Sequence, residues 1–270
     1  MSEPLNPYAP PQMLAAEQAP ILSEPRIAGG PPYQSAAGKA RFVVVTVGIT
    51  MVLQLALLVS FAMQIQMLER AKVLGELDQQ TAEASDLRQQ AIAGLMTVAG
   101  LVNFVALLVW IYAAQRNLPS LGARRLEFTP GWAVGWFFIP ILNLVRPCQA
   151  MFQLWTESDP ARIHAAGTGW QQPQSAALVG WWWGLRIVAG ITGGVFGAIA
   201  ANNQTLEGLI AISWAAIALT LLLDLPNDVC QILLVRRIQK NQEARQQWLA
   251  EAAPSRPADS FFADPPVATG

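Results

Sequence analysis

The sequence is poor in charge. Asp, Glu, Lys and Arg make up 13% of its 270 residues, which is about half the share that soluble domains carry. Hydrophobic residues make up 53%, and the formal net charge is −1. A soluble surface needs more charge than this, so the composition argues against a soluble globular protein. The near-neutral balance also gives no basis for nucleic-acid binding.

The residue types that most often carry catalysis or bind metals are scarce as well. The only histidine is His164, which excludes histidine-pair metal sites and histidine-based catalytic triads. The two cysteines, Cys148 and Cys230, lie in apolar segments without a CxxC spacing. No GxSxG, HExxH or phosphate-binding P-loop motif is present. We therefore expect neither an enzyme nor a bound metal or cofactor.

What the chain does have is long apolar runs. They cover residues 42–64, 91–113, 178–200 and 208–235. A helix of about 20 residues rises about 30 Å, which matches the hydrocarbon thickness of a bilayer. Only helices and closed barrels satisfy their backbone hydrogen bonds there, and continuous apolar runs of this length are typical of helices. The sequence predicts an all-α integral membrane protein with four transmembrane helices in a lipid bilayer.

The ends of the chain differ from this membrane domain, which we expect to cover residues 39–245. Eight of the 19 prolines fall within residues 1–38, and residues 246–270 are also rich in proline. Such segments cannot bury a core, so both are predicted to be disordered tails. The N-terminal tail is a candidate binding site for an unknown cytoplasmic partner. Residues 65–90 are predicted to extend the first two spans as helices, with a turn near residues 79–85.

Residues 130–157 are apolar enough to enter a membrane, but they are interrupted. Pro140, Asn143, Arg146 and Pro147 lie near the middle, and proline and arginine are costly inside a spanning helix. The alternatives are a fifth span and a re-entrant helix–turn–helix. Lys and Arg concentrate on the cytoplasmic side of multi-span proteins. With four spans most of these residues face the cytoplasm, whereas with five the larger share faces outward. The charge pattern therefore favours a re-entrant segment and two cytoplasmic termini.

Several short motifs occur in order along the middle of the membrane domain. They are Asn117-Leu118, Pro130–Ala133, Trp136–Pro140, Arg146-Pro147, Leu154-Trp155 and Trp181–Trp183. With these motifs the chain resembles, over roughly residues 40–245, the bacterial family catalogued as domain of unknown function 4328. The resemblance implies a multi-span protein of the bacterial inner membrane and no particular activity. The sequence departs from the family at Gln153, where an acidic residue is expected before Leu-Trp.

A polar cluster is expected inside the membrane. Its candidate residues are Arg146, Arg186, Asp224, Asn227 and Asp228. Ionisable residues within spans are costly and often functional. In the four-span arrangement all four charges fall in the cytoplasmic half, where we expect Arg186 to pair with Asp228 and Arg146 to reach Asp224. Such pairing could hold the re-entrant segment against the last two spans, or it could form a substrate or ion site.

Two further features concern the packing of the spans. Gly190, Gly194 and Gly197 lie on roughly one face of the third span, and small residues let helices approach closely. That face could pack within the chain or form a homodimer. Gln54 and Asn103 are single polar residues in the first and second spans, which predicts hydrogen bonds between helices.

These features favour a non-enzymatic structural or interaction protein. In this hypothesis the third span mediates assembly and the proline-rich tail recruits a partner. The alternative is a small transporter or channel that uses the Arg and Asp residues of the cytoplasmic half.

Overall fold

The computed structural model describes residues 32–252 except 77, 124–125, 161–174 and 204. Within this part the chain consists of helices and connecting loops, without a strand. Four of its helical runs are long and apolar enough to cross a membrane, and each contains one of the predicted spans. The predicted all-α membrane class with four spans is therefore confirmed. The predicted tails fall mostly outside the described residues.

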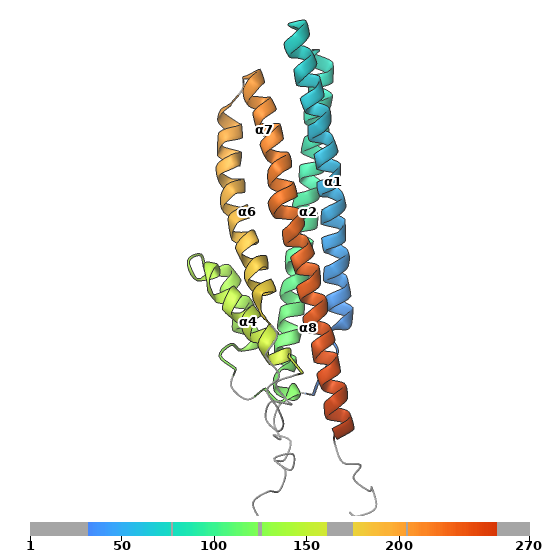
Figure 1. Ribbon diagram of the computed structural model, residues 1–270, viewed down its shortest axis with the longest axis vertical. Coiled ribbons are helices and arrows are strands. Elements are labelled where there is room, and N and C mark those ends of the chain that lie inside the picture. Colours follow the sequence, from blue (N-terminus) through green and yellow to red (C-terminus); the bar gives the residue numbers. More distant parts are fainter. Residues whose placement is uncertain (1–31, 77, 124–125, 161–174, 204, 253–270) are drawn as a thin grey trace, which may run out of the picture.

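Two antiparallel pairs make up the bundle (Figure 1). The first pair is α1 (Ala37–Leu74) and α2 (Gln79–Asn117); the second is α6 (Ala177–Asn202) and a continuous run of α7 (Leu206–Leu219), the π-helical turn η5 (Thr220–Asp224) and α8 (Leu225–Ala252). α1 packs on α2, α7 and α8, while α6 packs chiefly on α8 and the turn before it. α8 continues past residue 245, where the sequence predicted the membrane domain to end.

α1 ends at Leu74 and α2 starts at Gln79, so the chain turns before residues 79–85, where the sequence predicted the turn. Gly75 ends α1 with a φ of 75°, which glycine adopts without strain. Asp78 then caps α2, because its carboxylate accepts a hydrogen bond from the backbone N–H of Thr81 at 3.3 Å. The predicted helical extensions are correct, but the glycine and the cap end α1 and start α2 earlier than expected.

The run from α7 into α8 changes its hydrogen-bond pattern just before Pro226. Proline has no N–H for the carbonyl four residues earlier, and the backbone N–H of Leu225 donates to Thr220 five residues back. This π-type turn lets the helix continue across the proline instead of breaking, and such turns often mark functional sites. It also sets where the side chains of Asp224 and Asp228 point.

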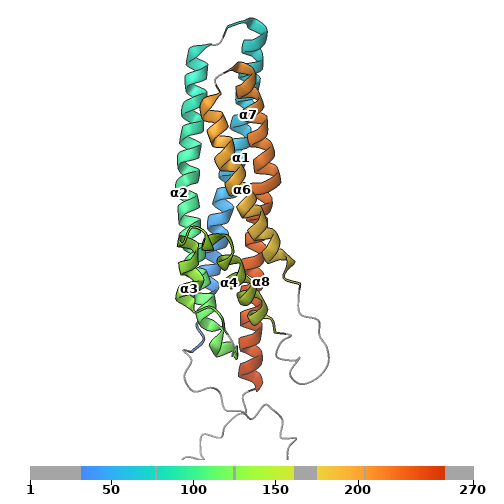
Figure 2. The same ribbon diagram turned by 90° about the vertical axis from the view of Figure 1, so that its left-hand side faces the viewer.

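Residues 119–158, apart from 124–125, form short helices and their connections at the end of the bundle where α2 ends and α6 begins (Figure 2). They are η2 (Pro119–Leu121), α3 (Pro130–Gly135), η3 (Trp136–Phe138), η4 (Leu142–Leu144) and α4 (Arg146–Ser158). Pro140 separates η3 from η4, and Pro147 lies in the first turn of α4. The segment is thus a helix–turn–helix and not a fifth span. Its depth in a membrane stays a prediction.

The hydrophobic core lies at this same end. Its largest buried side chains include Trp110 of α2, Met151 and Leu154 of α4, Trp182 of α6 and Ile238 of α8. The first residues of α1 and the last of α8 lie at this end too (Figure 1). The short helices therefore close one end of the bundle.

Candidate functional site

Asp228 is the centre of a buried polar cluster between α1 and α8. Its side chain is only 7% exposed. One carboxylate oxygen, Oδ2, accepts hydrogen bonds from Thr50 Oγ1 at 3.2 Å and from Gln54 Nε2 at 3.1 Å. A buried carboxylate is costly unless donors surround it. Thr50 and Gln54 supply these donors from one face of α1.

A second hydrogen-bonded group lies beside this carboxylate and joins a third helix. Asn103 of α2 accepts at Oδ1 from Thr46 Oγ1 of α1 at 3.1 Å and from Gln231 Nε2 of α8 at 3.1 Å. All of these side chains are buried. The predicted interhelical hydrogen bonds of Gln54 and Asn103 are therefore confirmed.

The polar residues of α1 share one helix face. Thr46, Thr50, Gln54, Ser60 and Gln64 fall within about 120° of one another at 3.6 residues per turn. Beyond Gln54 the contacts continue, because Ser60 accepts from Arg88 of α2 at 3.0 Å and Gln64 accepts from Ser213 of α7 at 3.1 Å. Thr46, Thr50 and Gln231 were not predicted from the sequence. Their signal was the four-residue spacing of polar residues within an apolar run, which puts them on one face.

Arg186 of α6 is close enough to Asp228 for electrostatic attraction, but in the described part of the chain the two side chains form no direct ion pair. The guanidinium instead lies 6.0 Å from the centre of the Phe104 ring. It faces a cavity of about 260 Å³ between α2, α6 and the α3–α4 connection. Asp228 accepts its hydrogen bonds from α1. The expected direct ion pair between Arg186 and Asp228 is therefore not formed in the described chain.

The structure does not bring Arg146 to Asp224 as the sequence predicted. Arg146 begins α4, and its Nη1 forms an ion pair with Glu127 at 2.9 Å. Asp224 instead interacts with Thr220 within the π-helical turn. Pro147 starts α4 next to the loop that carries Glu127, so Arg146 at the start of this helix lies beside Glu127.

Asn227, the remaining member of the predicted cluster, lies in the first turn of α8. Its side-chain oxygen is buried and accepts no hydrogen bond from the residues that the structure describes. The predicted cluster therefore does not form as one group. Asp228 accepts hydrogen bonds from α1, and Asp224 interacts with Thr220 in its own turn. Arg146 pairs with Glu127, while Arg186 faces a cavity.

Open space lies beside the three glycines of α6 in the described chain, and Gly190 borders the cavity at Arg186. A methyl group added at Gly190, Gly194 or Gly197 would meet no atom within 4 Å. The buried residues of α6, namely Val179, Trp182 and Trp183, all lie in its first two turns. Of the two alternatives for these glycines, packing within the chain is not observed.

The motif residues at the closed end hold its loops. Asn117 donates from Nδ2 to the backbone oxygen of Gln34 at 2.8 Å, and Trp183 donates from Nε1 to the backbone oxygen of Leu144 at 2.8 Å. Gln153 accepts from the backbone N–H groups of Glu127 and Phe128 at 3.0 and 3.1 Å. An acidic side chain could accept the same two hydrogen bonds, so the departure at position 153 preserves the geometry.

Comparison with known families agrees with these motifs. The family model described as a domain of unknown function, DUF4328, matches residues 74–240, which is more than half of the chain. The chain belongs to the DUF4328 family. The match includes all of the short helices and most of the bundle of this DUF4328 member. No curated protein and no solved structure matches the chain.

Proposed function

We propose that this protein is a non-enzymatic structural protein of the bacterial inner membrane that acts by assembly. A second copy of the chain is the partner, and α6 is the surface that binds it. A dimer has two copies of the proline-rich tail, residues 1–38, and therefore presents two binding sites for a cytoplasmic partner. The observation that carries the proposal is the open glycine face of α6.

That face suits helix association in a membrane. Lipid tails are as apolar as leucine, so helices associate there by close packing, which small residues permit. Gly190, Gly194 and Gly197 lie on this face, and no side chain of the described chain covers them. Ile191 and Val195 beside them are exposed and can pack across the axis of a dimer.

The test is Gly194→Ile. The new side chain meets no atom of its own chain, so the subunit should keep its fold and its thermal stability in detergent. We expect native mass spectrometry of the wild type in a mild detergent to show dimers and the variant to run as a folded monomer. Gly94→Ile is the matched control, because Gly94 is also exposed and free of neighbours but lies on α2. Monomeric wild-type protein, or equal loss of dimers in both variants, would contradict the proposal.

A small transporter or channel is the second candidate, and the buried carboxylate of Asp228 favours it. Ionisable groups inside spans often mark ion or proton paths, and the polar face of α1 runs from Thr46 to Gln64. Against it, Asp228 accepts hydrogen bonds from α1, and Asn103 accepts them from α1 and α8. These buried polar groups already have partners, as in a closed, packed bundle.

Flux assays in liposomes separate the two candidates. A transporter should move protons or monovalent cations across a liposome membrane, and Asp228→Asn together with Asp224→Asn, Arg186→Gln and Arg146→Gln should abolish that flux. The assembly proposal expects no flux in either protein.

A further inference from the structure

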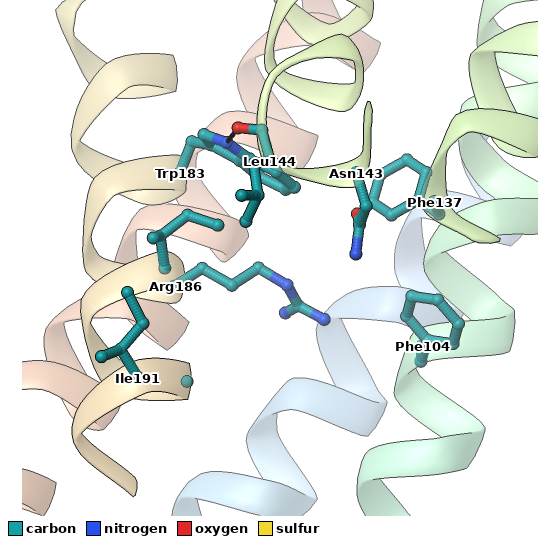
Figure 3. Close-up of a pocket in the computed structure, with 9 residues that line it drawn as sticks. Phe104, Phe137, Asn143, Leu144, Trp183, Arg186 and Ile191 are labelled. Atoms are coloured by element: carbon teal, nitrogen blue, oxygen red, sulfur yellow. Dashed lines mark hydrogen bonds between the residues drawn. The ribbon is translucent and has the colours of Figure 1, made fainter. Parts of the chain in front are cut away.

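The cavity in front of Arg186 combines one cation with apolar walls (Figure 3). It has a volume of about 260 Å³. α2 contributes Phe104, the α3–α4 connection contributes Phe137 and Asn143, and α6 contributes Trp183, Arg186 and Ile191. Trp183 fixes the connection to α6 by donating to the backbone oxygen of Leu144, so the cavity walls are tied together.

The guanidinium of Arg186 extends from α6 across this cavity toward Asn143 and Phe104 (Figure 3). Among the residues that the structure describes, no acceptor takes a hydrogen bond from it. Asp228 attracts it from a distance, but the Asp228 carboxylate is held on α1 by Thr50 and Gln54. A guanidinium has five N–H donors. A half-buried cation without acceptors is costly inside a membrane domain, so the site favours an anionic group with several oxygens.

The rest of the cavity favours an apolar tail on that anion. Ile191 lines the cavity and is also 62% exposed on the outer face of α6, so the cavity wall continues onto the lipid-facing surface. Val195, one turn further along α6, is exposed as well. A small inorganic anion would leave these walls uncovered, whereas an acyl chain would cover them.

The position along α6 suits a lipid headgroup near an interface. Arg186 follows the exposed Trp181 by five residues, which is a rise of about 7.5 Å. Tryptophans of spanning helices gather at the membrane interface, and Arg side chains reach from just below it toward the headgroups.

We propose that this cavity binds an anionic amphiphile, with its phosphate or carboxylate head on Arg186 and its acyl chain along Ile191 and Val195. The Asn143 amide is placed to donate to the same head. This site requires only residues of one chain, but it shares Gly190, Ile191 and Val195 with the proposed dimer face, so a bound acyl chain and a second copy of the chain would compete for that part of α6.

The test uses the full chain, delipidated in a mild detergent, with native mass spectrometry to count bound ligands. Four ligands are titrated: phosphatidylglycerol, oleic acid, phosphatidylcholine and inorganic phosphate. Phosphatidylglycerol or oleic acid should bind about tenfold or more tightly than the zwitterionic lipid, since a hydrogen-bonded charge contributes about 1.5–3 kcal/mol. The tighter of these two identifies the head as phosphate or carboxylate.

Three variants locate the site. Arg186→Gln should weaken binding about tenfold, whereas Arg41→Gln, the matched control at an exposed arginine of α1, should leave it unchanged. Gly190→Leu keeps Arg186 but fills the cavity; Gly190 lines the cavity and has open space around it, so the fold tolerates the change. This variant should weaken binding as much as Arg186→Gln does, and it tests the site even if Arg186→Gln unfolds.

Several results would overturn the proposal. Equal binding of phosphatidylcholine would show that the charge is not recognised. Equal loss in Arg41→Gln and Arg186→Gln would show general attraction to a basic surface. Inorganic phosphate that binds as tightly as the amphiphiles would remove the role of the acyl chain, and unchanged binding by Gly190→Leu would place the ligand elsewhere.

Discussion

At the scale of single residues, the partners of Asp228 matter more than its charge. The sequence suggests an arginine partner, because an opposite charge is the usual way to stabilise a carboxylate within a span. The structure instead supplies neutral donors, Thr50 and Gln54, from a neighbouring helix. Neutral donors leave Arg186 available for a ligand, which an ion pair with Asp228 would not.

This difference predicts the outcome of two double-mutant cycles measured by thermal unfolding in detergent. Gln54→Leu combined with Asp228→Leu should give a coupling energy of about 0.6 to 1.7 kcal/mol, the range for hydrogen bonds between spanning helices. Arg186→Leu combined with Asp228→Leu should give a smaller coupling energy, because no direct ion pair joins them. A larger value for the second cycle would mean that the two charges meet in the membrane.

At the scale of elements, an indole hydrogen bond joins the α3–α4 connection to α6. Pro140 and the short turns η3 and η4 leave this segment few helical hydrogen bonds of its own. The indole N–H of Trp183 donates to the backbone oxygen of Leu144 at 2.8 Å. This bond therefore links a non-helical stretch of backbone to a long helix.

Trp183→Phe keeps the ring and removes the donor, which should cost about 0.5 to 1.5 kcal/mol of stability. We expect the loss to be local. Amide hydrogen exchange should become faster in residues 139–149 and stay unchanged in α1 and α2. Trp181→Phe is the control, because Trp181 is 67% exposed. Equal exchange in both variants would show that the indole bond does not hold the connection.

At the scale of the whole molecule, both described ends of the chain lie at the closed end of the bundle (Figure 1). An even number of spans requires this, and the distribution of Lys and Arg predicts that this end faces the cytoplasm. The opposite end is tied by an ion pair of Lys72 with Glu207 at 2.8 Å. The orientation of the bundle stays a prediction.

Reporter fusions test that orientation. A fusion after residue 250 should be active only with a reporter that works in the cytoplasm. A cysteine placed at Glu83, near the start of α2, should react with an impermeant thiol reagent added from outside. A fusion at residue 250 that is active only outside the cytoplasm would show that the predicted orientation of the bundle is wrong.

The four spans, the break at residues 130–157 and the family were all determined by the sequence alone. Each depends on local properties: the length of an apolar run, a proline that cannot donate, and the order of short motifs. Gln54 and Asn103 could be predicted to bond between helices for a similar reason, since a polar group within a span needs a partner.

Only the tertiary structure decided which partner each polar residue has. Thr50 is 178 residues from Asp228 in the chain, and their contact depends on how α1 and α8 are rotated about their axes. Arg146 contacts Glu127 instead of Asp224 because α4 lies at the end of the bundle and not beside η5. Helix rotation and the docking of short helices follow from packing over the whole bundle. Composition and residue spacing do not specify helix rotation or docking, so the cavity at Arg186 could not be predicted from the sequence.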